Sequence, residues 1–201
     1  MRSMLLDSLA ALALVAAACG DDDEPAAFAG FERVPAPMVA DVELPQVDAD
    51  GNETPFVFRA VDDGVLLVYF GYTSCPDVCP TTLSDVRSAL ADVGDDAERV
   101  DLAMVTIDPD RDTPDVLTGY VGFFLEGSSA VRTTDDPSLR AAADVFGVDY
   151  GVETTAEGEI EVFHTGSLYA IDDAGTLVLT WPFGVPADDL ASDLDRLLED
   201  T

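Results

Sequence analysis

The stretch Val65-Leu66-Leu67-Val68-Tyr69-Phe70-Gly71-Tyr72-Thr73-Ser74-Cys75-Pro76-Asp77-Val78-Cys79-Pro80 decides the fold of this chain. Its first six residues form a continuous apolar run, which is typical of a buried central strand. Pro80 suits the first turn of a helix, and the apolar spacing that follows predicts a helix ending at Gly94. The stretch therefore predicts a strand–turn–helix unit with Cys75 in the turn and Cys79 near the start of the helix.

The rest of the chain alternates strand and helix signals. Thr113-Pro114 and Asp136-Pro137 each predict the start of a helix, and Gly147 predicts the end of the second one. Further strands are expected at 55–59, 100–107, 160–163, 168–171 and 177–179, and a final helix at 187–198. Residues 41–201 thus predict an α/β domain, a thioredoxin-like mixed sheet flanked by helices, with an additional N-terminal strand region and a β-hairpin insertion.

The charge of the chain narrows the range of partners. Its 201 residues carry 41 Asp and Glu against nine basic residues, all arginine, for a net charge of −32. A polyanion would be repelled by such a surface, so nucleic acid is excluded as a partner. The acidity is typical of a halophilic protein, because high salt screens the self-repulsion and hydrated carboxylates keep the protein soluble. The alternative is a role of the acidic surface in binding cations.

The N-terminus resembles an export signal. Residues 1–19 combine Arg2, a short apolar run and small residues before Cys19, and the run is too short to span a bilayer. Cys19 is the expected lipidation site, which would anchor the protein in the cell membrane facing the extracytoplasmic side. A cleaved and released form, or an uncleaved anchor, is the alternative. Residues 20–40 read as an acidic flexible tether.

The chemistry available to the domain lies in two thiols and one imidazole. Cys75 and Cys79 are its only cysteines, and His164 is the only histidine of the chain. A helix N-terminus favours thiolate over thiol, so we expect lowered thiol pKa values. A structural disulfide, a redox-active pair and a pair of metal ligands all remain open, although a disulfide across so short a loop removes little unfolded-chain entropy. His164 follows a predicted strand, and its position alone does not establish a role.

Three motifs in order identify a family. The block Gly71-Tyr72-Thr73-x-Cys75-Pro76-Asp77-Val78-Cys79-Pro80-Thr81-Thr82-Leu83 resembles the signature of the Sco/SenC copper proteins. Asp108-Pro109-x-Arg111-Asp112-Thr113-Pro114 resembles a second family block. His164 with Ser167-Leu168-Tyr169 and Ile171-Asp172 resembles a third. The resemblance covers roughly residues 41–198.

This resemblance implies a thioredoxin-like fold and binding of Cu(I) or Cu(II) by Cys75, Cys79 and His164. It also implies delivery of copper to the dinuclear copper centre in the copper-binding subunit of a haem-copper terminal oxidase. Many relatives carry Asp immediately before the histidine, whereas this chain has Phe163. The orientation of the imidazole is therefore an open point, because outer partners fix such ligands.

Two other functions use the same residues. A thiol–disulfide oxidoreductase would employ Cys75 and Cys79 on cysteines of the oxidase subunit and would need a thiol reductant of its own. Three residues separate the cysteines instead of two, and His164 would then have no task. A peroxidase would need an arginine at the reactive thiolate, for which Arg111 is the candidate.

Three further features have two interpretations each. Asp77 either caps the following helix or faces a bound cation or partner. The cluster of Asp108, Arg111 and Asp112 either forms a structural turn with an ion pair or shapes the rim of the metal site. Trp181 with Phe183 either packs at the core or domain edge or forms an anchor for a partner.

Overall fold

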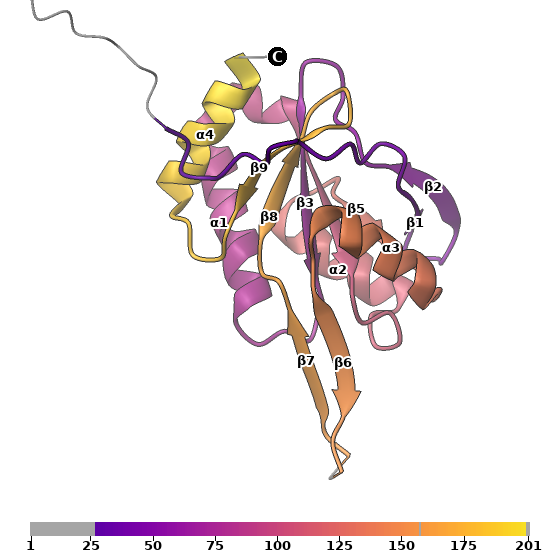
Figure 1. Cartoon of the computed structure of the whole chain (residues 1–201). Coiled ribbons are helices and arrows are strands. Elements are labelled where there is room, and N and C mark those ends of the chain that lie inside the picture. Colours follow the sequence, from indigo (N-terminus) through magenta and orange to yellow (C-terminus); the bar gives the residue numbers. More distant parts are fainter. Residues whose placement is uncertain (1–26, 157, 200–201) are drawn as a thin grey trace, which may run out of the picture.

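A seven-stranded mixed sheet forms the centre of the molecule (Figure 1). The computed structural model describes residues 27–156 and 158–199. The strand order is β2-β1-β5-β4-β3-β8-β9. The strands are β1 (Glu43–Val47), β2 (Glu53–Val57), β3 (Val65–Gly71), β4 (Val100–Thr106), β5 (Ser129–Val131), β8 (Leu168–Ile171) and β9 (Leu177–Trp181).

Strand β3 is the axis of the sheet. It pairs in parallel with β4 and antiparallel with β8, and all seven of its residues are buried. A strand covered on both faces is apolar throughout, which is why the run from Val65 to Phe70 predicted a buried central strand. The antiparallel pairing of β8 with β9 confirms the hairpin predicted there.

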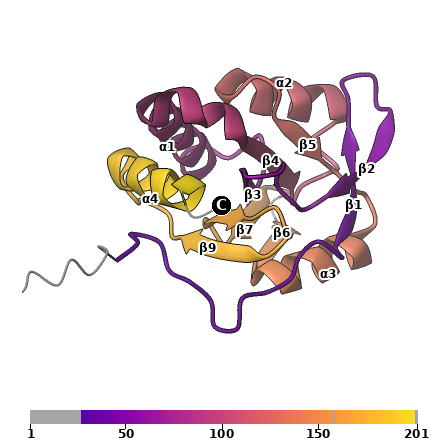
Figure 2. The same ribbon diagram turned by 90° about the horizontal axis from the view of Figure 1, so that it is seen from above.

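Helices cover both faces of the sheet (Figure 2). Helices α1 (Val78–Val93), α2 (Pro114–Phe124) and α4 (Ala187–Glu199) lie on one face, and α3 (Asp136–Phe146) lies on the other. A 3₁₀ segment, Gly94–Arg99, follows α1. The connections β3-α1-β4 and β4-α2-β5 join parallel neighbours in one direction across the sheet, so both helices fall on the same side. The predicted α/β class and the mixed sheet flanked by helices are confirmed.

The caps of α3 show how closely the sequence signals match the structure. Asp135, one residue before the predicted Asp136, is the N-cap, and its carboxylate accepts a hydrogen bond from the Ser138 amide. Gly147 ends the helix with φ 71°, a left-handed conformation that glycine adopts without the strain of a Cβ. The prediction of Gly147 as the helix end is confirmed, and the cap is displaced by one position.

A separate two-stranded ribbon projects from the end of the sheet (Figure 1). Strands β6 (Tyr150–Thr154) and β7 (Ile160–His164) pair antiparallel, with Tyr150 opposite His164 at the base. The sequence indicated β7 but not β6, because Gly151 and three largely exposed residues interrupt the apolar pattern. Strands β1 and β5 were not predicted either, because β1 has a mixed polar and apolar sequence and β5 is only three residues long.

The segment from Ala27 to Ala40 is part of the folded body. Phe31 exchanges backbone hydrogen bonds with Thr180 of β9, and the Val39 amide donates to the Gly175 carbonyl. Val39 is fully buried. The prediction that a flexible tether extends to residue 40 is therefore wrong for residues 27–40, because the backbone of this stretch is hydrogen-bonded along β9 and Val39 and Phe28 pack against the core. Residues 20–26 and the predicted signal with Cys19 lie outside the described residues.

Candidate metal centre

The pairing of β8 with β3 brings the histidine to the cysteines. Leu168, the first residue of β8, lies opposite Tyr69 near the end of β3. Antiparallel pairing therefore starts β8 where β3 ends, and the loop before β8 lies beside the loop after β3. His164 ends β7 just upstream of that loop, while Cys79 lies in the first turn of α1.

Three ligand atoms converge there. The Sγ atoms of Cys75 and Cys79 and a ring nitrogen of His164 all lie within 4.8 Å of one another. The Cys79 Sγ is 3.5 Å from His164 Nε2, and the Cys79 amide donates a hydrogen bond of 3.3 Å to Cys75 Sγ. Both cysteines are free thiols. Among the histidine, cysteine, aspartate and glutamate residues that the structure describes, these three form the group whose spacing suits a metal ion.

The two thiols differ in environment. Cys79 is fully buried, and burial raises its pKa to about 12 despite a bond from the Tyr72 backbone. Cys75 is half-buried; burial raises its pKa, but hydrogen bonds from the backbone of Cys79 and Asp77 outweigh this and leave the pKa lower than that of an ordinary cysteine thiol. The predicted lowering by the helix N-terminus thus holds for Cys75. It is wrong for Cys79, because the loss of hydration on burial raises the thiol pKa by more than the helix N-terminus lowers it.

The imidazole is oriented without an acidic neighbour. His164 Nδ1 lies 3.0 Å from the Thr165 carbonyl, so Nδ1 carries the proton and Nε2 offers its lone pair toward Cys79. Burial lowers the pKa of His164, with a smaller opposing effect of the Thr165 carbonyl, so the ring favours the neutral form that binds metals. Phe163 points to the opposite face of the ribbon, where its ring lies against Gly151. The Thr165 carbonyl therefore fixes the orientation of the imidazole, although Phe163 stands where many relatives carry Asp.

Two tyrosines flank the site, and the sequence analysis did not single them out. The rings of Tyr69 and Tyr72 meet the His164 ring edge-on, with centroids 6.0 and 5.8 Å away. Burial, followed by the charge of Cys75, raises the pKa of Tyr72 to about 12, so its phenol keeps its proton. Tyr69 lies in β3 and Tyr72 directly follows it. Tyr72 stands within the quoted Gly71-Tyr72-Thr73 block, which was the available signal.

The contacts of Asp108, Arg111 and Asp112 support their interpretation as a structural turn with an ion pair. The Arg111 guanidinium pairs with the Asp108 carboxylate, which is buried. Arg111 also lies over the Tyr72 ring, 5.8 Å from its centre. The cation that a peroxidase would need at the thiolate is thus engaged by Asp108. Asp112 is fully buried and bonds to the loop that carries Cys75.

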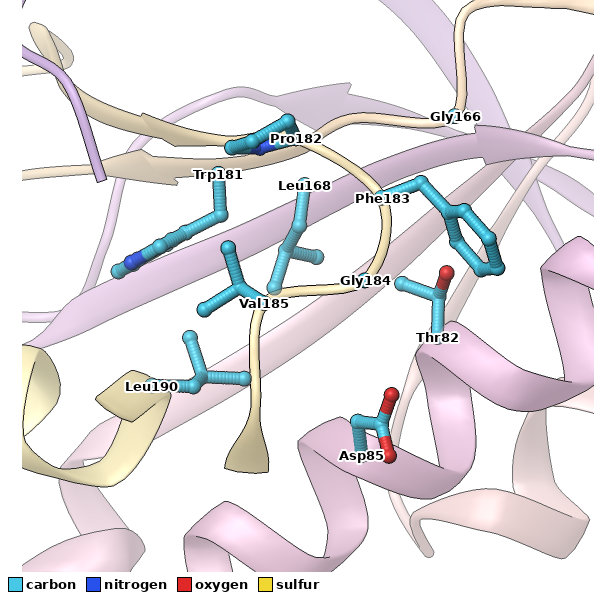
Figure 3. A pocket seen from close by; sticks show the side chains of 10 residues that line it. All are labelled: Thr82, Asp85, Gly166, Leu168, Trp181, Pro182, Phe183, Gly184, Val185 and Leu190. Carbon is cyan, nitrogen blue, oxygen red and sulfur yellow. The ribbon is translucent and has the colours of Figure 1, made fainter. Parts of the chain in front are cut away.

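Other predicted residues fall outside the ligand set. Asp77 is the N-cap residue of α1, but its side chain makes no capping hydrogen bond, so the capping interpretation is wrong. Trp181 is buried in the core, whereas Phe183 is 47% exposed. Figure 3 shows both beside a small pocket between α1 and the β9–α4 loop, bordered by Thr82 and by Gly166 of the histidine loop. The pair thus divides into a core residue and a surface residue.

The donor set fits copper. Two thiolates and one imidazole are soft and borderline ligands, which suit Cu(I) and, with the imidazole, Cu(II). Structural zinc sites take four protein ligands, whereas this cluster supplies three, of which Cys75 and His164 are partly exposed and Cys79 is buried. The spacing and the chemistry of these three donors suit a thiophilic metal ion.

Comparisons with known proteins agree with this geometry. A protein of Stutzerimonas stutzeri that is named for copper binding is 32% identical over 136 residues, covering 67% of this chain and 66% of that protein. The SCO2-like protein RP587 of Rickettsia prowazekii is 31% identical over 54% of each chain. The chain thus spans between half and two thirds of the length of these curated relatives.

Solved structures share the fold. The apo Sco1 protein from Thermus thermophilus is 30% identical, with a TM-score of 0.70 over 85% of this chain and 97% of that one. Bradyrhizobium japonicum ScoI, solved with copper bound, is 27% identical, with a TM-score of 0.62 over 77% and 97%. These likenesses confirm the expected thioredoxin-like sheet. The sequence model of the SCO1/SenC family matches residues 46–199, and the chain therefore belongs to the SCO1/SenC family.

Proposed function

We propose that this protein is an extracytoplasmic copper metallochaperone that holds copper through Cys75, Cys79 and His164. The observation that carries the proposal is the convergence of these three ligand atoms within 4.8 Å at a partly exposed edge of the fold. Sco proteins with copper bound have been solved from Bradyrhizobium japonicum and from yeast. Copper is the cargo here, so the site must both bind and release it.

Each ligand contributes differently to loading. Cys75 has the lower thiol pKa and the greater exposure, so its thiolate meets the incoming ion first. Cys79 must then lose its proton, because its buried thiol has a pKa of about 12 without metal. The neutral His164 ring closes the site with Nε2. Loading requires both thiols to be reduced, since a disulfide offers no thiolate pair.

The proposed recipient is the copper-binding subunit of a haem-copper terminal oxidase, at its dinuclear copper centre. BsSco, a structural neighbour, is described as a member of the Sco family of cytochrome c oxidase assembly proteins. Release would proceed by ligand exchange, with a recipient thiolate approaching from the side of Cys75. The exposed residues Pro76 and Asp77 border that approach.

Membrane attachment is a further part of the proposal. Among residues 27–156 and 158–199, no helix combines the length and the apolar character needed to cross a bilayer. We propose that a lipid on Cys19 anchors the protein on the extracytoplasmic side. Mass spectrometry of the N-terminal peptide from the native membrane fraction tests this, and an unmodified Cys19 would remove the lipid anchor from the proposal.

Copper titration tests the central proposal. The reduced protein should take up one copper ion per chain, and the Cys75→Ser/Cys79→Ser double variant should take up none at the same concentration. Absorption spectroscopy of the Cu(II) form should show a thiolate-to-copper charge-transfer band that the double variant lacks. Absence of copper uptake by the reduced wild-type protein would overturn the metallochaperone proposal.

A thiol–disulfide oxidoreductase is the second candidate, and the split between the two thiols favours it. The Cys75 thiolate would attack a substrate disulfide, forming a mixed disulfide and releasing one substrate thiolate. The Cys79 sulfur would then attack the Cys75 sulfur, forming the Cys75–Cys79 disulfide and releasing the second substrate sulfur, which takes up the proton that Cys79 loses. Two electrons pass from the pair to the substrate, and a thiol reductant must restore the pair.

Copper uptake and disulfide exchange, measured on the wild-type protein and on His164→Ala, separate the two candidates. His164→Ala removes a copper ligand but neither exchange thiol. Reduction of an oxidised peptide carrying two cysteines should remain near the wild-type rate in this variant if the protein is an oxidoreductase. Efficient exchange combined with no copper uptake by the wild-type protein would establish the oxidoreductase instead of the metallochaperone.

A further inference from the structure

A buried carboxylate lies against the loop that carries Cys75. Asp112 has no exposed surface, and its oxygens accept hydrogen bonds from three groups. The Thr73 amide donates over 3.1 Å, and the hydroxyls of Thr73 and Thr106 each donate over 2.5 Å. Two of these three donors belong to Thr73, which precedes Cys75 by two positions. The carboxylate thus connects the cysteine loop to the end of β4.

The position of Asp112 is itself fixed from the other side. Its amide donates to the Asp108 carbonyl over 3.0 Å, and its carbonyl accepts a bond of 2.8 Å from Arg132 Nε. Arg132 also donates to the Pro109 carbonyl. The turn from Asp108 to Asp112 is therefore held at both ends, and the carboxylate has little freedom to follow a moving loop.

The cysteine loop has few other attachments. The Gly71 carbonyl accepts a bond from the Ile107 amide, and the Cys75 amide donates to the Tyr72 carbonyl over a long 3.3 Å. Between these points, Thr73 is the residue whose backbone and side chain are both held by a group outside the loop. Thr73 thus ties the backbone before Cys75 to the rest of the fold, while the Cys79 amide holds Cys75 Sγ itself.

We propose that Asp112 is a positioning residue for the Cys75 thiolate and acts through Thr73. This inference deepens the proposed function, because it concerns how one ligand of the copper site is held. Partners of this outer kind orient metal ligands, and their loss typically reduces metal affinity by about 10–100-fold. A charge-assisted hydrogen bond to a buried carboxylate is also about twice as strong as a neutral one, which suits such a role.

The two hydroxyl donors provide a matched experiment. Thr73→Val and Thr106→Val each remove one hydroxyl bond of the same length to the same carboxylate, but only Thr73 belongs to the cysteine loop. Thr106→Val also removes the acceptor of the Asp108 amide, so it is the more disruptive change for the turn and the stricter control. Thr73→Ser keeps the hydroxyl and tests for rescue. Each full-length variant is reduced and titrated with Cu(II) against a chelator, its absorption and electron paramagnetic resonance spectra are recorded, and its thermal unfolding is measured without metal.

A second readout does not involve copper. Alkylation by iodoacetamide, followed cysteine by cysteine with mass spectrometry, reports the environment of Cys75 in the apo protein. We expect Thr73→Val to weaken Cu(II) binding about tenfold, to shift the charge-transfer band, and to slow alkylation of Cys75 several-fold at neutral pH. Thr73→Ser should behave as wild type. Thr106→Val should lower the unfolding temperature while leaving the copper spectra in place.

The outcomes separate this inference from the proposed function. Unchanged copper spectra and unchanged Cys75 alkylation in Thr73→Val would overturn the positioning role. Equal changes in Thr73→Val and Thr106→Val would also overturn it, because they would report general destabilisation. If wild type takes up no copper, the metallochaperone proposal fails, while the alkylation rates still decide whether Asp112 positions Cys75.

Discussion

Cys79 Sγ lies 3.5 Å from His164 Nε2, although 85 positions separate the two residues in the chain. This contact joins the first turn of α1 to the base of the β6–β7 ribbon. It joins a local pair of thiols and an imidazole into one cluster whose spacing suits a metal ion. The imidazole is also the ligand that distinguishes a copper site from a simple redox pair.

Replacing His164 by Ala should therefore affect Cu(II) far more than Cu(I). Two thiolates suffice for the soft Cu(I) ion, whereas Cu(II) gains most from the imidazole. We expect the Cu(II) charge-transfer band to be lost or strongly shifted, with one Cu(I) still bound per chain. Phe163→Ala is the matched control, because this exposed ring points to the other face of the same strand. Identical Cu(II) spectra in His164→Ala and wild type would disprove the three-ligand site.

The sequence was sufficient for the cysteine half of the site. A continuous apolar run, a turn and Pro80 are local signals, so they placed Cys75 in the turn and Cys79 at the helix start. The histidine half depends on a long-range event, the pairing of Leu168 with Tyr69. No local pattern encodes that pairing, and only the family resemblance pointed to His164.

Local sequence signals also did not predict how deeply each residue is buried. The helix N-terminus predicted lowered pKa values for both thiols, but only the three-dimensional packing shows that Cys79 is sealed from water. Likewise, Pro45 and Gln46 gave β1 no alternating pattern, although β1 pairs with two strands. The β1 segment is therefore a strand because β2 and β5 pair with it, and not because of its own sequence pattern.

The two cysteines should react at different pH. Burial raises the pKa of Cys79 to about 12, whereas backbone hydrogen bonds outweigh burial at Cys75 and hold its pKa below that of an ordinary thiol. Since the thiolate is the nucleophile, Cys75 should be alkylated by iodoacetamide at neutral pH while Cys79 stays protected. Peptide mass spectrometry after short exposure measures both rates, and an unfolded sample provides the control. Faster labelling of Cys79 than of Cys75 in the folded protein would contradict this assignment.

Copper affinity should rise with pH. Copper binding through the Cys79 thiolate releases the Cys79 proton, because burial raises the pKa of this thiol to about 12. One released proton makes the apparent affinity increase about tenfold per pH unit below the pKa of about 12, and the increase would end above it. Chelator competition for Cu(I) from pH 8 to 10 measures the slope. A flat profile over this range would mean that Cys79 does not lose a proton on binding.

Salt should stabilise the fold. The net charge of −32 makes the native state repel itself, and the screening length falls from about 10 Å at 0.1 M to about 3 Å at 1 M salt. We expect the unfolding temperature to rise from 0.1 to 2 M KCl, by about 2–4 °C for each kcal/mol gained. Equal ionic strengths of KCl and NaCl should act alike if screening is the cause. An unfolding temperature that is constant or falls with salt would exclude the high-salt adaptation.

Asp193 should be a major support of the domain. This buried carboxylate accepts hydrogen bonds from Trp181 Nε1 at 2.8 Å and from the amides of Ala29 and Gly30 at 3.1 and 2.9 Å. It therefore joins α4 to β9 and to the N-terminal segment. In Asp193→Ala the indole N–H loses its partner inside the core, which alone costs about 1–3 kcal/mol.

Urea unfolding measures this cost, because Trp181 is the sole tryptophan and its fluorescence reports the same site. Asp195→Ala removes an exposed carboxylate from the same helix and is the matched control. We expect the midpoint to fall in Asp193→Ala and to stay within experimental error in Asp195→Ala. Limited proteolysis should also cut Asp193→Ala earlier near residues 27–33, since two amides there lose their acceptor. Equal midpoints for the two variants would show that the N-terminal segment is held by its apolar contacts and not by this carboxylate.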